Sequence, residues 1–577
     1  MAAAQALFEV HVRREGRWTI DDTTKDEGDA MAFARKLVGQ SGVESVKVMR
    51  DGPNKFGRVT SEAIFAQERQ VSRDNDRIVL PMIDRAAPCE ARDALYGLAA
   101  RLTMSRLFKP YLTRFTVTPS EVMYNAREMK RVMDKDNLVA TAVGRVAGLQ
   151  ARGDQGVAKQ RRDLLHGFVD EIAERARKAD GVKLPDIAKV GFQQLESDLF
   201  TRYPNESDAD YMLRVAIARA LVNERNWWGK LDRSVGWAAS GGASARSVAA
   251  LDDFIADTLA DAALLQDILG PQRDLGHALN ALLDLIEGKA PQRRGGGAEA
   301  EMGVTVDRLV GLMQTGKLPG AVAVLFDRMR GQLAQNAPLT RTGKVDDEED
   351  AYRDLLLRLV SADRGVLGGG DMAAALVERM TRLTNRGGVA GRRDAVEQIV
   401  QLLRDPHRQL SFMFAVRESA IVMDVAETID MLLERIVGQC DTVHDLDPGQ
   451  HSPIDLMQFV TSLYYLIDGS NLMGEFKRRL LDHVDQLLLD FVRDENILSR
   501  LDSPNLPLRK RTEMLMGLCL PVILPPGKAV AAARAIIIGY LRQPNFEIRL
   551  VEDIADPVEK ATVLRRIFDT MKRAGFR

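Results

Sequence analysis

Apolar residues recur every three or four positions through most of this sequence, a period typical of amphipathic helices. The segment 452–492 shows this period most clearly. It contains two apolar stripes: Leu456, Phe459, Val460, Leu463, Leu466 and Ile467, then Met473, Phe476, Leu480, Val484, Leu487 and Phe491. Gly469 lies between the stripes, which predicts two antiparallel helices over 452–468 and 471–493. Because one such pair cannot bury both of its faces, we expect further helical pairs to stack against it.

Local signals around Ser452 indicate where the first of these helices begins. Ser452 is a good N-cap residue, and Pro453 suits the first helical position, where its missing N–H is not needed. Asp455 places a negative charge at the positive end of the helix dipole. Surface pairs such as Glu475 with Arg479 add only about 0.2–0.5 kcal/mol each. We therefore expect burial of the apolar stripes to hold the pair together.

The first sixty-odd residues follow a different pattern. Polar and apolar residues alternate over 8–13, which predicts a half-buried strand. A second strand is expected through Trp18 and Ile20, a helix over 26–38, a third strand at 46–48 and a fourth over 58–65. These elements form a small module with a thin core of its own.

The predicted fold class is therefore mainly α, with a small N-terminal α/β (ββαβ-like) module followed by a large multi-helix body. The body is expected to be an irregular α-solenoid or a set of helical bundles, with helices that include 89–107, 119–134 and 411–439. The predicted divisions are a module at 1–66, a linker at 67–88, a helical domain at 89–287, a flexible linker at 288–303 and a C-terminal helical domain at 304–577. The last linker contains three consecutive glycines and no apolar period.

Charge and composition argue against several classes of partner. The 80 basic and 82 acidic residues nearly cancel, so charge gives no strong case for nucleic acid. The most apolar segments, 515–524 and 529–541, are shorter than the ~20 residues of a membrane-spanning helix. The three cysteines, Cys89, Cys440 and Cys519, are too scattered for a disulfide framework and fit a reducing compartment. We expect a cytoplasmic protein with no membrane span.

Cys440, His444 and His451 form the one group with metal-ligand character in the sequence. Structural zinc sites usually combine two close ligands with two distant ones, and a second Cys/His pair is not evident. A polar loop between two helices is the preferred interpretation. No metal or cofactor is predicted, and these three residues remain only a weak metal candidate.

Two other patterns could suggest a ligand. Gly387-Gly388 and Gly391 precede two arginines, and a helix N-terminus of this kind can hold a phosphate. A phosphate loop also needs a strand before it and Lys-Ser/Thr after it, so an inter-helix loop is preferred. Basic residues over 101–114 alternate with aromatic ones, as in single-strand nucleic-acid sites. The aromatics occupy helical core positions, so core packing is the preferred interpretation.

Trp227, Trp228 and Trp237 are three of the four tryptophans in the chain. They lie around a short polar stretch and precede a Gly/Ser-rich segment at 240–247. Aromatic residues beside a flexible loop are typical interface anchors, and they are equally typical of a loop folded back onto helices. These tryptophans are the candidate partner-binding residues.

The leading functional hypothesis is a non-enzymatic cytoplasmic interaction or scaffold protein. Its helical surfaces would be presented to other proteins, or to a second copy of the same chain. The alternative is a ligand- or metal-regulated signalling protein in which the N-terminal module or the 440–451 loop senses and the helices relay. An enzyme whose catalytic groups converge only in three dimensions is a third class that the sequence leaves open. No catalytic residue is predicted.

Overall fold

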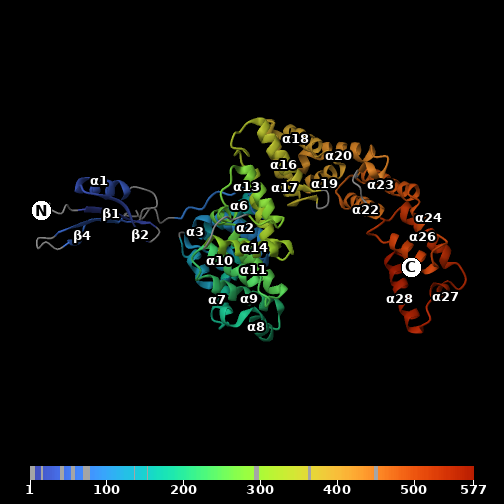
Figure 1. Ribbon diagram of the computed structural model, residues 1–577, viewed down its shortest axis with the longest axis horizontal. Helices are drawn as coiled ribbons and strands as arrows, with labels where there is room; N and C mark the ends of the chain where they lie inside the picture. The colour runs from blue at the N-terminus through green and yellow to red at the C-terminus, as the bar shows by residue number, and fades with distance from the viewer. Residues whose placement is uncertain are drawn as a thin grey trace.

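The computed structural model describes residues 7–14, 17–38, 45–53, 59–68, 78–135, 137–151, 154–291, 298–361, 365–446 and 452–576. A small sheet-containing module begins the chain, and a large helical body follows it (Figure 1). The predicted fold class is therefore confirmed. The body ends in an arm of helices that curves away from its globular part (Figure 1).

The N-terminal module is a four-stranded antiparallel sheet with one helix on its face. Its elements are β1 (Leu7–Arg14), β2 (Arg17–Thr24), α1 (Glu27–Val38), β3 (Ser45–Pro53) and β4 (Val59–Glu68), with strand order β2-β1-β3-β4. The core consists of Phe8, Val10, Val12, Ala30, Ala34, Leu37, Val46 and Val48. The alternation over 8–13 therefore separates a face that packs on α1 from a face that does not. Trp18 and Ile20 belong to the second face and are 41% and 54% exposed.

The globular part of the body runs from a short 3₁₀ helix, η2 (Arg92–Tyr96), to α13. Its helices are α2 (Leu98–Leu107), α3 (Lys109–Phe115), α4 (Pro119–Tyr124), α5 (Ala126–Met133), α6 (Leu138–Gln150), α7 (Gln155–Asp180), α8 (Ile187–Arg202), α9 (Glu206–Leu221), α10 (Trp227–Ala238), α11 (Ala245–Leu259), α12 (Ala262–Leu269) and α13 (Leu275–Ile286). Helix α11 is central, because it contacts α2, α4, α9, α10 and α15. Phe254 and Ile255 of α11 are completely buried.

The later helices begin with α14 (Ala298–Gln314), α15 (Pro319–Leu333) and α16 (Val345–Leu359), and a two-residue hairpin follows, β5 (Val360–Ser361) with β6 (Gly365–Val366). The arm then contains α17 (Gly369–Leu383), α18 (Gly388–Leu403), α19 (Pro406–Arg417), α20 (Val422–Gly438), α21 (Val443–Leu446), α22 (Pro453–Gly469), α23 (Gly474–Asp494), α24 (Ile497–Leu501), α25 (Leu508–Leu518), α26 (Lys528–Leu541), α27 (Phe546–Leu550) and α28 (Pro557–Arg573). Neighbouring helices pack in pairs, such as α17 with α18 and α25 with α26.

The predicted pair over 452–493 is α22 and α23, which pack against each other. Ser452 caps α22 as expected, because its hydroxyl accepts the N–H of Asp455 at 3.3 Å. Two residues assigned to the apolar stripes are instead exposed, Leu466 by 47% and Met473 by 76%. Leu466 lies near the end of α22, and Met473 is the N-cap residue of α23. Both lie at the ends of the helices rather than in their packed middle.

Within 89–107, predicted as one helix, the 3₁₀ helix η2 and α2 are separated by Gly97, whose backbone is extended. The segments 119–134 and 411–439, also predicted as single helices, are broken too. Within 119–134, Asn125 ends α4 with an extended backbone, and its side chain accepts the N–H of Arg127 at 3.0 Å to start α5. Within 411–439, α19 ends at Arg417 and α20 begins at Val422. The apolar period continues through both breaks, so periodicity alone did not reveal them.

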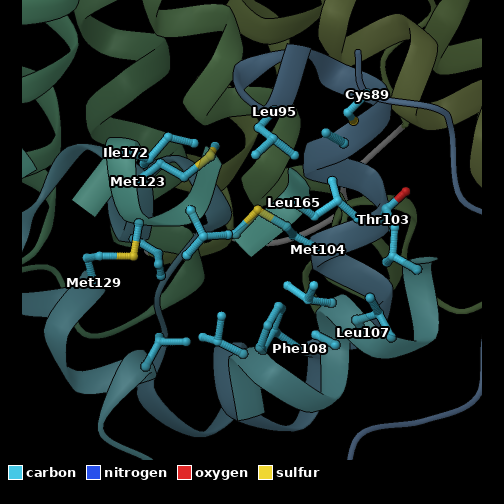
Figure 2. Close-up of a pocket in the computed structure, with 18 of the residues that line it drawn as sticks. Cys89, Leu95, Thr103, Met104, Leu107, Phe108, Met123, Met129, Leu165 and Ile172 are labelled. Carbon is cyan, nitrogen blue, oxygen red and sulfur yellow. The ribbon is translucent and has the colours of Figure 1, made fainter. Parts of the chain in front are cut away.

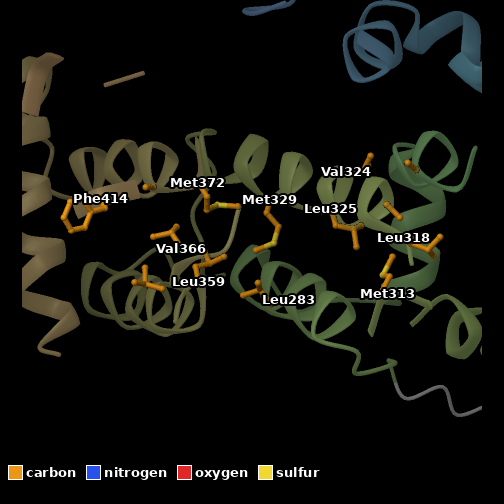
Figure 3. Packing of buried hydrophobic residues seen from close by; sticks show 14 of the residues in the cluster. Leu283, Met313, Leu318, Val324, Leu325, Met329, Leu359, Val366, Met372 and Phe414 are labelled. Carbon is orange, nitrogen blue, oxygen red and sulfur yellow. The ribbon is translucent and has the colours of Figure 1, made fainter. Parts of the chain in front are cut away.

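Most buried apolar residues of the helical body form one continuous cluster from Ile78 to Ala574 among the described residues. A small separate cluster contains Cys89, Ala100, Val143, Ala147 and Leu165. Figure 3 shows its middle, where Leu283 of α13, Met329 of α15 and Met372 of α17 lie in one layer. The predicted domain division at 288–303 stays a prediction, and residues 292–297 of that segment lie outside the described residues.

Within the described ranges, no single helix has the length and apolar character needed to cross a bilayer. One pair, Met302–Gln314 with Pro319–Leu333, meets the length and composition test only when both helices are combined, and it is bent by 100°.

Candidate functional site

A groove of about 570 Å³ lies between α2 and α3 on one side and α10, α11 and α15 on the other. Its buried lining includes Leu112, Val117 and Val324. Its edge carries Met82, which is 82% exposed, and the half-buried Trp227. Charged residues of both signs complete the lining: Asp84, Arg106, Lys109, Asp257, Asp261, Asp327 and Arg328. An apolar floor with a polar rim is the usual anatomy of a binding surface.

Asp327 of α15 is the electrostatic centre of this groove. Its carboxylate accepts hydrogen bonds from Arg106 of α2 at 3.0 Å and from Arg85 at 3.2 Å, and it also pairs with Arg330 on its own helix. Burial, together with the neighbouring charges of Arg330 and Arg106, lowers the pKa of Arg85. The Arg106–Asp327 pair therefore bridges the two sides of the groove, and Arg85 attaches the segment before α2 to the same point.

A buried ionic network fixes the helices beneath the groove. Asp257 of α11 accepts hydrogen bonds from Arg101 of α2 at 2.9 Å and from the N–H of Ser120, in the first turn of α4, at 2.8 Å. Arg101 also pairs with Asp253 at 2.9 Å. Burial alone would lower the pKa of Arg101, but the carboxylates of Asp257 and Asp253 outweigh it and raise that pKa. Arg101 is thus a buried structural cation rather than part of a solvent-facing basic track. Tyr111, an aromatic residue of the same candidate track, is buried in the core.

The structure places the three predicted tryptophans on one helix but not in one site. Residues 227–238 form α10, so the short polar stretch between the tryptophans is helical. Trp227 lines the groove. All three tryptophans pack against the helical core, and Trp237 meets the ring of Phe192 edge-on at 5.7 Å.

Cys440 and His444 lie in a region whose contacts are those of a polar turn. The buried Cys440 thiol donates to the carbonyl of Ile436 at 3.0 Å, and burial raises its pKa to about 11, which disfavours the thiolate that a metal requires. His444 packs edge-on to Phe491 at 5.6 Å, and Asp445 accepts the N–H of Thr442 at 2.8 Å. His451 lies outside the described residues. Among the residues that are described, no three His, Cys, Asp or Glu side chains group closely enough to hold a metal ion.

A second polar pocket, of about 580 Å³, surrounds the glycines at 387 and 388. Four arginines line it, and each already has a partner: Arg379 with Glu348 at 3.1 Å, Arg382 with the Leu333 carbonyl at 3.1 Å, Arg386 with Asp394 at 2.6 Å and Arg392 with Glu378 at 2.7 Å. A Cβ on Gly391 would lie 1.8 Å from the Arg386 carbonyl oxygen, so this glycine is needed for packing. Helix α17 precedes the glycines, in keeping with the inter-helix loop that the sequence favoured.

A third cavity, of about 120 Å³, lies behind the groove and is almost wholly apolar (Figure 2). Thr103, Met104 and Leu107 of α2 face this cavity, whereas Leu102, Ser105 and Arg106 of the same helix face the groove. Protein interiors are normally close-packed, and a space of this size lowers stability by about 3 kcal/mol, at roughly 24 cal/mol per Å³. The sequence contained no signal for it, because its lining residues resemble ordinary core residues.

No family model, curated protein or solved structure matches this chain. Apart from Trp227, the residues that line the groove were not predicted from the sequence as a binding site. Arg106 was recognised only as a basic residue, and its partner Asp327 is 221 residues away along the chain. The geometry of the groove is therefore the main support for a function.

Proposed function

We propose that this protein is a non-enzymatic interaction protein that holds a segment of a protein partner in the groove beside Trp227. One observation carries this proposal. The groove combines a buried apolar lining, a half-buried tryptophan, an exposed methionine and charges of both signs. Tryptophan is enriched among the residues that dominate binding energy at protein interfaces.

The charged residues of the groove support a binding role. Arg106 and Asp327 are already paired across it, so they define its rim and the spacing of its walls. Lys109 is solvent-exposed at the edge and can attract an acidic residue of the partner. Rim charges of this type mainly affect association rate and specificity. A partner segment with apolar side chains flanked by acidic residues fits this arrangement.

The curved arm offers further surface to a partner. Helical arrays commonly act by presenting extended faces, and the arm from α17 to α28 is an array of paired helices (Figure 1). Its exposed apolar residues include Met423 and Met431 of α20, at 87% and 62% exposure. In this proposal the groove is the specific recognition site for the partner, and the arm adds contact area.

Site-specific photo-crosslinking tests the proposal. A photoreactive amino acid is placed at Met82, on the groove edge, and in a matched control at Val345, the exposed first residue of α16, which lies outside both the groove and the arm. We expect the Met82 position to give a defined protein adduct, identified by mass spectrometry, that the Val345 position does not give. A second copy of this chain counts as a partner.

Two further variants decide whether the adduct depends on the groove. Trp227→Ala removes the tryptophan of the groove, whereas Trp18→Ala removes an exposed tryptophan of the N-terminal module. We expect the first to abolish the adduct and the second to leave it unchanged. Lys109→Glu gives an independent measurement if the tryptophan variant folds poorly. The proposal is overturned if both crosslinking positions give the same adducts, or if neither Trp227→Ala nor Lys109→Glu changes them.

A further inference from the structure

The apolar cavity behind the groove divides the core of the globular part. A small cluster made by Cys89, Ala100, Val143, Ala147 and Leu165 is separate from the main core. Residues from both clusters line the same cavity, for example Leu165 from the small cluster and Met123 from the main core. The cavity therefore occupies the place where the two clusters would otherwise meet.

The lining of the cavity offers a ligand few polar groups with which to form hydrogen bonds. Of the described lining residues, Thr103 and Cys89 have side chains with a polar hydrogen, and each already donates a hydrogen bond. The Thr103 hydroxyl donates to the Ala99 carbonyl at 2.9 Å, and the Cys89 thiol donates to the Ala87 carbonyl at 3.8 Å. A polar or charged ligand would lose its hydration there without compensation. The chemistry of the cavity therefore selects an apolar group.

The methionines of the lining can adapt to the shape of a ligand. Met104, Met123 and Met129 come from α2, α4 and α5, and Figure 2 shows them around the cavity. Methionine is unbranched and polarizable, so it can repack around an incoming group at small cost. The side nearest to solvent is formed by the exposed Ala87 and the half-buried Leu95 and Val146.

We propose that this cavity binds an uncharged hydrocarbon group of about six to eight carbon atoms, since an engineered apolar cavity of about 150 Å³ binds benzene. At about 120 Å³, this cavity is in the same range of size. The group is a free ring compound or the tail of a longer molecule whose polar end lies toward Ala87. The inference does not depend on the function proposed for the groove.

Calorimetric unfolding of the full chain tests the binding. The probes are benzene and n-hexane, each compared with the protein alone, and octanoate serves as a probe for a tailed molecule. We expect at least one of them to raise the unfolding temperature of the helical body by about 1–2 °C near saturation. A response to benzene indicates a ring-shaped occupant, and a response to octanoate without benzene indicates a tail.

A matched pair of variants on α6 locates the binding. Ala142 is buried and lines the cavity, whereas Ala140 faces solvent on the same helix. We expect Ala142→Leu to fill the space, raise the unfolding temperature and abolish the response to the probe, while Ala140→Leu keeps the full response. Xenon binding to the wild-type chain, followed by ¹²⁹Xe NMR, needs no variant. The inference is overturned if xenon and all three probes fail to bind, or if Ala142→Leu folds and responds like the wild type.

Discussion

Asp252 of α11 accepts the backbone N–H of Gly320 at 2.6 Å and that of Ala321 at 2.9 Å, and it thereby caps α15 from another helix. Leu318, at the N-cap position of α15, has an apolar side chain that cannot do so. Asp485 of α23 caps α26 in the same way, through the N–H of Lys528 at 2.7 Å. The starts of these helices are therefore set by tertiary contacts, and α15 carries the Asp327 that organises the groove.

Replacing Gly320 by alanine should weaken this cap. A Cβ at residue 320 would lie 2.8 Å from the Asp252 carboxylate, so the carboxylate must move away from the N–H groups. We expect Gly320→Ala to lower the free energy of unfolding by about 1–3 kcal/mol, measured by urea denaturation. Gly311 of α14 has open space around its Cβ position, and Gly311→Ala should be neutral or raise stability by up to about 1 kcal/mol. Equal effects of the two substitutions would contradict this account.

The Asp252 cap should also make stability depend on pH. Burial raises the pKa of Asp252 to about 6, against about 3.9 in an unfolded chain. At a pH between these two pKa values, Asp252 therefore keeps its proton in the folded state but has lost it in the unfolded state. The stability linked to this proton is complete below about pH 4 and is lost as pH rises through about 6. Asp252→Asn cannot ionise, so the stability of the wild type relative to this variant should fall between pH 4 and pH 7. A constant difference in urea midpoints over that range would refute the assignment.

Asp327→Asn should loosen the groove. The substitution leaves Arg85, Arg106 and Arg330 around a neutral side chain, so their mutual repulsion is no longer balanced. We expect the free energy of unfolding, measured by urea denaturation, to fall by about 1–2 kcal/mol. This loss should be smaller in 1 M salt, because salt screens the repulsion between the arginines. Asp371, which is 66% exposed and also pairs with Arg330, provides the control. Asp371→Asn should lower the free energy of unfolding by less than about 0.5 kcal/mol. Equal losses in the two variants would show that Asp327 contributes no more to stability than Asp371 does.

Lys230 of α10 and Glu121 of α4 form a fully buried ion pair, and Lys230 also donates to the Leu221 carbonyl at 3.1 Å. Lys230→Met should leave the Glu121 carboxylate buried without its counter-charge and lower stability by about 3–5 kcal/mol. The double variant Glu121→Gln with Lys230→Met should recover part of that loss, because no unpaired charge then remains. Lys289→Met, at a position 66% exposed, should change stability by less than about 1 kcal/mol. Additive effects in the double variant would mean that the pair is not coupled.

The sequence predicted the elements well but the site poorly. Strand alternation predicted the N-terminal sheet, including its fourth strand, and the apolar period predicted the pair α22 and α23 with the Ser452 cap. The breaks at Asn125 and between Arg417 and Val422 were missed, because they do not interrupt the period. The three candidate partner-binding tryptophans all pack against the core, and of these only Trp227 also lines the groove.

By itself the sequence determined which segments are helices and strands and which side of each is apolar. These properties arise from contacts within one or two helical turns, or between neighbouring residues of a strand. Only the tertiary structure decided that Asp252 would cap a helix 68 residues away, that Arg106 would meet Asp327, and that α2 would separate a groove from an apolar cavity. Such contacts depend on how helices cross, and crossing is set by the packing of many side chains at once rather than by any local pattern.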